Sequence, residues 1–188
     1  MQILDFITMP SLSIPCIFSI GMFDGVHRGH QYLLQQAKKV AVEKPLAVFT
    51  FHQATSLIPL DKKRSKLEGE GVDILIECDL TPEIKNLSPE SFLSILEEKC
   101  PIDMWVVGSD VSFGKNREGD RYFLEKQGVK AILLERITYE GVDVSSTRIR
   151  EYLRQGLYNE ADALLGYPLK GEIYETTYDT NMPICSCR

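Results

Sequence analysis

The sequence predicts a doubly wound α/β fold: a parallel sheet of about five strands with helices on both faces. Two observations predict it. Apolar runs of strand length alternate with stretches of helical periodicity along most of the 188 residues. The runs are apolar throughout rather than alternating in polarity, which is typical of parallel strands buried on both faces. Short connections and right-handed crossovers then give a Rossmann-like architecture.

The predicted strands are short runs rich in β-branched and aromatic residues, most of them ending at a glycine or a charged residue. They cover residues 16–21, 45–51, 72–77, 103–108 and 129–135. A run at residues 167–175, YPLKGEIYE, predicts a lone strand after the alternation has ended.

The predicted helices lie between and after these strands, and most carry a recognisable start or stop signal. The first has apolar residues at helical spacing, at Leu33, Leu34, Ala37, Val40 and Ala41. Ser88 before Pro89 and Ser145 or Ser146 are N-cap candidates, and Gly128 and Gly156 are expected to end helices. The helices cover residues 29–44, 88–99, 120–128, 145–156 and 159–166.

The composition limits the classes of function. The formal net charge of −6 argues against broad, sequence-independent nucleic-acid binding, which needs a basic surface, but it allows a local site for a small polyanion. The five cysteines include no Cys-x-x-Cys pair, so buried reduced thiols and a cytoplasmic location are expected. Neither a signal peptide nor a membrane-spanning run is expected, because the apolar stretches are short and interrupted.

Residues 21–30 read GMFDGVHRGH, at the point where the first predicted strand passes into the first helix. Glycines there allow positive φ and close approach to a ligand, and the free N–H groups of the helix N-terminus favour phosphate. His27 and His30 are three residues apart and share one face of the helix start. Helix capping and a zinc site are the alternatives for the histidines, the second disfavoured by the lack of paired cysteines. We interpret the turn as a phosphate site.

The turn resembles the first motif of the bacterial FAD synthetase family, in its FMN adenylyltransferase module. This module is part of the nucleotidyltransferase group with the His-x-Gly-His signature. Residues 106–120, VVGSDVSFGKNREGD, look like the family's VVG-x-D-F-x-F-G-x-x-R-x-G-D segment. Residues 144–166 look like its I-S-S-T-x-x-R motif and the following helix pair. The resemblance covers about residues 15–168.

The resemblance implies transfer of AMP from ATP to FMN, giving FAD and pyrophosphate, by a nucleotidyltransferase domain at residues 1–166. ATP and FMN would be substrates, with Mg²⁺ held mostly by phosphate oxygens and no protein metal ligand expected. Small-molecule nucleotides are the expected partners, without nucleic acid or membrane. The implied catalytic residues are His27, His30 and Arg150. The implied ATP-binding residues are Gly21, Met22, Phe23, Asp24, Gly25, His27, His30, Ser145, Ser146, Thr147 and Arg150. The implied flavin-binding residues are Asp110, Phe113 and Arg117.

Two departures from the family pattern keep alternatives open. Where the family shows Phe-x-Pro-His-Pro, residues 51–55 read FHQAT, and the connection to the next strand looks short. A flavin- or nucleotide-binding homologue without turnover is therefore the alternative function, and a nucleotidyltransferase with another acceptor is a further one. Residues 167–188 resemble only the start of a riboflavin kinase barrel, so riboflavin kinase activity is expected to be absent.

Overall fold

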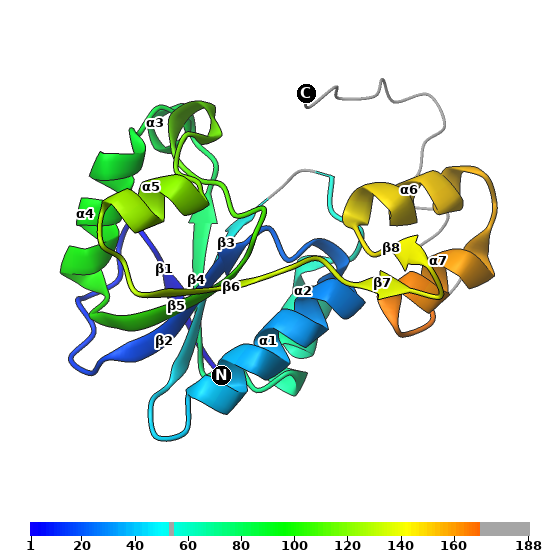
Figure 1. Cartoon of the computed structure of the whole chain (residues 1–188), viewed down its shortest axis with the longest axis horizontal. Coiled ribbons are helices and arrows are strands. Elements are labelled where there is room, and N and C mark those ends of the chain that lie inside the picture. The colour runs from blue at the N-terminus through cyan, green and yellow to red at the C-terminus, as the bar shows by residue number, and fades with distance from the viewer. Residues whose placement is uncertain (53–54, 170–188) are drawn as a thin grey trace.

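The computed structural model describes residues 1–52 and 55–169. In these ranges six parallel strands form the central sheet, in the order β1-β4-β3-β2-β5-β6 (Figure 1). The predicted doubly wound α/β class is confirmed. The strands are β1 (Gln2–Asp5), β2 (Cys16–Gly21), β3 (Leu46–His52), β4 (Ile74–Asp79), β5 (Ile102–Gly108) and β6 (Ala131–Leu134).

The strand of the central sheet that was not predicted is β1, at the edge beside β4, and the two short strands at residues 138–139 and 142–143 were not predicted either. β1 pairs in parallel with β4, from Gln2 opposite Ile74 to Asp5 opposite Glu77. Three of its four residues are exposed, so its sequence lacks the continuous apolar character of the central strands. β6, at the other edge, was predicted, although its residues are more exposed than a strand covered on both faces would be.

Helices cover both faces of the sheet. Those at residues 60–69 and 82–85 were not predicted, whereas the N-caps predicted at Ser88 and Ser145 are present. Ser88 and Ser145 each accept a hydrogen bond from the backbone N–H three residues later, as N-caps do, and Asp120 caps the helix at residue 121 in the same way. The helices are α1 (Arg28–Val40), α2 (Leu60–Gly69), α3 (Pro82–Lys85), α4 (Pro89–Lys99), α5 (Arg121–Lys126), α6 (Ser146–Arg154) and α7 (Tyr158–Leu165). None of those in the described ranges has the length and hydropathy of a membrane span.

Two apolar cores lie on opposite faces of the sheet, because successive residues of a strand point to opposite sides. Ile17, Val48 and Leu75 belong to the core packed by α1, α2, α6 and α7. Their neighbours Phe18, Phe49 and Ile76 belong to the core packed by α4 and α5. This division explains why the strands read as apolar throughout.

The carboxyl edge of the sheet has a topological switch point. β2 lies between β3 and β5, so the chain leaves it toward one side and later returns on the other. Ligands of open α/β sheets bind beyond the strand ends at such a point. Beyond this edge, α6, α7 and a hairpin of β7 (Thr138–Tyr139) and β8 (Val142–Asp143) form a group beside the start of α1 (Figure 1).

Other sequence predictions concern the cysteines and the end of the chain. Cys16, Cys78 and Cys100 are free and buried, which confirms the prediction for these three. Cys185 and Cys187 lie outside the described residues, as do residues 53–54 of the altered motif and most of the predicted strand at 167–175.

Candidate active site

The turn that follows β2 has an unusual backbone. Phe23, Gly25 and Val26 have φ values of 45°, 72° and 39°, and Asp24–Val26 form a short 3-10 helix, η1. A positive φ is unfavourable for a residue with a Cβ, most of all for a β-branched valine, and such strain collects at functional sites. Both non-glycine side chains are buried, so packing of Phe23 and Val26 holds the turn in this shape.

His27 and His30 stand together at the start of α1. Their rings are stacked, with centroids 3.8 Å apart and planes 14° apart. His27 is the N-cap of α1, and its Nδ1 accepts a long hydrogen bond of 3.4 Å from the His30 backbone N–H. The capping role that the sequence left open for His27 is thus present. Within the described residues, His30 Nδ1 is buried and has no hydrogen-bond partner.

Burial keeps both imidazoles neutral near pH 7. It lowers the pKa of His27 to about 4, against an opposing pull from Asp24. It also holds the pKa of His30 well below the ordinary histidine value, and the positive charges of a protonated His27 and of Lys63 lower it further. A neutral imidazole has one N–H to donate, so the pair can bind an oxyanion by hydrogen bonds.

This shift makes the stability of the protein depend on pH. Between pH 6.5 and about 4 the unfolded chain binds a proton at residue 27 that the folded chain does not bind. The free energy of unfolding is therefore expected to fall as the pH drops through this window. Urea unfolding at pH 7 and pH 5 measures the loss, and His27→Gln should show a smaller loss than the unmodified chain. An equal loss in both proteins would contradict the assignment to His27.

Asp24 connects the turn to two distant parts of the chain. One carboxylate oxygen accepts from the Leu57 backbone N–H at 2.7 Å and from the Ser56 hydroxyl at 3.2 Å. The other is paired with the Arg150 guanidinium, whose second nitrogen donates to the Thr55 carbonyl at 2.6 Å. The Asp24 side chain is 6% exposed and that of Arg150 is 21% exposed, so most of this ion pair is shielded from water.

The start of α6 packs against the same turn. The Ser146 hydroxyl donates to the Asp24 carbonyl oxygen at 3.1 Å, and the Ser145 side chain caps the helix. Thr147 is exposed. The structure therefore joins Asp24 of the first motif to Ser146 and Arg150 of the last, which are 122 and 126 positions away in the sequence.

Gly25 meets two structural demands at once. Its φ is 72°, and a Cβ added there would lie 2.9 Å from Leu57 Cδ1 and 3.2 Å from Leu165 Cδ2. We expect Gly25→Ala to lower the free energy of unfolding by about 2 kcal/mol, from backbone strain together with overpacking. Gly128→Ala is the matched control, because Gly128 has a φ of 70° and nothing within 4 Å of an added Cβ. Equal losses in the two variants would contradict the packing argument.

The residues predicted for the flavin follow β5. Asp110 is exposed and paired with Arg136, at 2.6 and 3.0 Å from two of its nitrogens. The charges of Asp110 and Arg136 both act on the pKa of His27, the first raising it and the second lowering it. Arg117 is exposed and donates to the Ser112 hydroxyl at 2.9 Å. The Phe113 ring is 3% exposed and packs in the core on Phe92 and Trp105.

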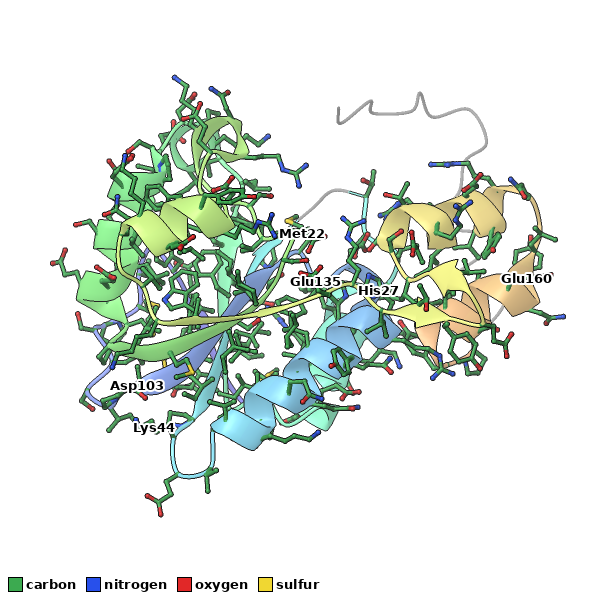
Figure 2. The ribbon with its side chains drawn as sticks, in the orientation of Figure 1. Met22, His27, Lys44, Asp103, Glu135 and Glu160 are labelled. Atoms are coloured by element: carbon green, nitrogen blue, oxygen red, sulfur yellow. The ribbon has the colours of Figure 1, made fainter. Side chains whose placement is uncertain are left out.

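Sequence reasoning missed other residues that hold the site. The Tyr167 hydroxyl donates to the Gly25 carbonyl at 2.5 Å, and Gln31 Nε2 donates to the carbonyls of Val26 and Leu165. Lys63 is buried beside the turn. The charge of Arg136 acts on the pKa of His27, and Figure 2 labels Glu135, the residue before Arg136, at this edge of the sheet. Tyr167 begins the run that resembles the start of a riboflavin kinase barrel, and the other residues stood in no motif that the sequence analysis recognised.

The described residues contain no group of three or more His, Cys, Asp or Glu side chains arranged to hold a metal ion. The assembled features are instead those of an oxyanion site. They are two neutral imidazoles, the N-terminal ends of two helices, and a guanidinium held at the back of the turn.

Comparison with known proteins identifies relatives that match most of the chain, including the motifs of the site. The FAD synthetase family model matches residues 10–148. A bifunctional riboflavin kinase/FMN adenylyltransferase of Listeria monocytogenes is 34% identical over 169 residues, covering 81% of this chain and 54% of the relative. A FAD synthetase of the same organism is 31% identical, covering 81% of this chain and 69% of the relative.

A solved structure has the same fold. The crystal structure of a protein described as a macrolide-efflux protein from Streptococcus pneumoniae superposes with a TM-score of 0.81 at 25% identity, covering 90% of this chain and 61% of that one. The chain spans about half the length of the bifunctional relatives from Listeria monocytogenes and Pseudomonas fluorescens, which it matches in their N-terminal part. With the family model matched over most of the sequence, the chain belongs to the FAD synthetase family.

Proposed function

We propose that this chain transfers AMP from ATP to FMN and releases pyrophosphate, giving FAD. The observation that carries the proposal is the stacked, neutral His27–His30 pair at the start of α1, directly behind the positive-φ turn. The names of the relatives, which include FMN adenylyltransferase and FAD synthetase, support the same reaction.

The reaction needs no enzyme nucleophile. A phosphate oxygen of FMN forms a bond to the α-phosphorus of ATP, and the bond from that phosphorus to the bridging oxygen breaks, so that pyrophosphate leaves. The charge that moves onto the leaving group must be stabilised. In the proposal, His27 and His30 donate hydrogen bonds to the phosphates, and the N–H groups at the starts of α1 and α6 add to this field. Mg²⁺ would enter with ATP, bound mostly to phosphate oxygens.

The turn before α1 and the N-terminus of α6 are already held together in the free protein. Asp24 and Arg150 join the turn to α6, and Ser146 adds a hydrogen bond to the same turn. Arg150 therefore aligns the site through Asp24, and in the proposal it also contributes a positive charge to phosphate binding. Preformed alignment of this kind reduces the entropy that is lost when the reactants are positioned.

The flavin is proposed to bind on the other side of the switch point. Asp110 and Arg117 are exposed after the carboxyl end of β5 and would contact FMN, while the buried Phe113 supports their loop from the core. A cytoplasmic location, where ATP is available, is part of the proposal and is supported by the free thiols of Cys16, Cys78 and Cys100.

The test is direct synthesis. The purified chain is incubated with ATP, Mg²⁺ and FMN, and the flavins are separated by chromatography. We expect FAD and an equal amount of pyrophosphate, with none when FMN is replaced by riboflavin. Calorimetry that shows nucleotide binding in the absence of any FAD formation would overturn the proposal in favour of a binding protein without turnover.

A further inference from the structure

Lys63, on α2, is the only lysine among the buried residues of ranges 1–52 and 55–169, with 5% of its surface exposed. Its Nζ donates to the Met22 carbonyl at 2.7 Å and to the Thr50 hydroxyl at 2.6 Å. The Thr50 hydroxyl in turn donates to the same Met22 carbonyl at 3.0 Å. The three groups form a closed set of hydrogen bonds at the carboxyl ends of β2 and β3.

These three hydrogen bonds lie where the chain leaves the sheet, so they affect the turn that follows. Gly21, Thr50 and Glu77 occupy one row across β2, β3 and β4. Met22 follows directly, and Phe23 after it begins the positive-φ turn. Holding the Met22 carbonyl therefore fixes the point at which the chain leaves the sheet for the turn. Figure 2 labels Met22 at this edge.

Lys63 is not the partner of a buried ion pair. In the part of the chain that the structure describes, neither nearby carboxylate bonds to it, since Asp24 pairs with Arg150 and Glu77 with Arg64. Burial lowers the pKa of Lys63 to about 8, and Asp24 and Glu77 oppose the shift from a distance. A buried ammonium group without a direct counter-ion stabilises the fold little. Stability therefore does not explain why a lysine occupies position 63.

The charge of Lys63 acts on the imidazole of His30. It is among the causes that lower the pKa of His30, after burial and the charge of His27. The Phe23 ring, one residue beyond the Met22 carbonyl, packs on the His30 ring with centroids 5.0 Å apart. Lys63 thus reaches His30 by two routes, through the backbone of the turn and through its electric field.

We propose that Lys63 is a positioning residue for nucleotidyl transfer, which fixes the Met22 carbonyl and, with it, the turn that sets Phe23 against His30. This inference rests on the proposed function, because its catalytic consequence concerns FAD formation. The titratable groups that face Lys63 are the carboxylates of Asp24 from η1 and Glu77 from β4 and the neutral imidazole of His30 from α1, and Arg64 on its own helix neutralises part of the Glu77 charge.

The experiment compares Lys63→Met with Lys62→Met, an exposed lysine on the same helix. Lys63→Gln is the second variant, since an amide keeps a donor for Met22 without the charge. We expect Lys63→Met to lower kcat for FAD formation about 10- to 100-fold, as displacement of a positioned group does, with a smaller change in KM. Lys62→Met should match the unmodified chain, and Lys63→Gln should lose less than Lys63→Met.

Two further measurements separate positioning from a structural role. Urea unfolding at pH 7 should show that Lys63→Met is as stable as the unmodified chain or more stable, because a buried charge has been removed. An NMR titration of His30 in the free proteins should show a higher pKa in both Lys63 variants and no change in Lys62→Met. The titration does not depend on turnover, so it tests Lys63 even if the unmodified chain forms no FAD and the proposed function fails.

Three results would overturn the inference. The first is an unchanged kcat in Lys63→Met. The second is an unchanged His30 titration in both Lys63 variants. The third is a fall of kcat in parallel with stability, which would make Lys63 a structural residue only.

Discussion

Replacement of His30 by alanine is expected to lower kcat for FAD formation about 1,000-fold while the protein remains folded. Removal of one preorganised donor to a developing oxyanion typically slows an enzyme by about 100- to 1,000-fold. His30 is at the upper end because its ring also stacks on His27, so its loss frees the second imidazole as well. Its Nδ1 has no hydrogen-bond partner within the described residues, so the variant leaves no broken protein hydrogen bond at this atom.

The measurement is a steady-state assay of FAD by chromatography at saturating ATP and FMN. Gln35→Ala is the matched control, because Gln35 lies on the exposed side of α1, away from the turn. Urea unfolding of both variants shows whether the fold is retained. A His30→Ala protein with a kcat within threefold of the unmodified chain would remove His30 from the phosphate site and leave it as a packing residue.

The sequence predicted those parts of the fold whose signals are local. The run at β2, the helical spacing in α1, and the caps at Ser88 and Ser145 each lie within a few residues, and the structure has them all. The α2 helix was missed for a physical reason. The two residues that it buries are Lys63 and Leu67, so a lysine occupies a core position and the apolar period is absent. Because α2 was not predicted, Lys63 was not recognised as a residue near the site.

Contacts between segments far apart in the sequence could not be predicted from local sequence patterns. Asp24 stood in a recognised motif, as did Arg150, but nothing in either motif indicated that the two side chains bond to each other across 126 positions. The resemblance implied that Arg150, as the last residue of the I-S-S-T-x-x-R motif, binds ATP, and a guanidinium group can bind phosphate through two hydrogen bonds. The structure shows that the same group is also the anchor of α6 on the turn, which only the folded chain reveals.

This anchor leads to the second large effect, on stability. Asp24→Asn is expected to lower the free energy of unfolding by about 3 kcal/mol, because removal of one partner leaves the other charge of a shielded pair uncompensated. Asparagine keeps an acceptor for the Leu57 N–H, so the loss reports mainly on Arg150. FAD formation is expected to fall as well, because the turn and the start of α6 lose their alignment.

The control for Asp24→Asn is a variant of another ion pair, which lies at the amino-terminal ends of β3 and β5. Asp103 and Lys44 are 2.6 Å apart but about 40% exposed, and both are labelled in Figure 2. Asp103→Asn should lower stability by less than about 1 kcal/mol, as exposed pairs do, and leave FAD formation unchanged. Urea unfolding of both variants at pH 7 makes the comparison.

A double-mutant cycle assigns the loss to the pair itself. If Asp24 acts through Arg150, Arg150→Gln alone should also destabilise the protein, and adding it to Asp24→Asn should remove less stability than the two single losses together. The expected coupling is about 2 kcal/mol, within the range for residues in direct contact. Additive losses would mean that Asp24 stabilises the turn only through Leu57 and Ser56, and that α6 is held in place by Ser146 and by its apolar contacts.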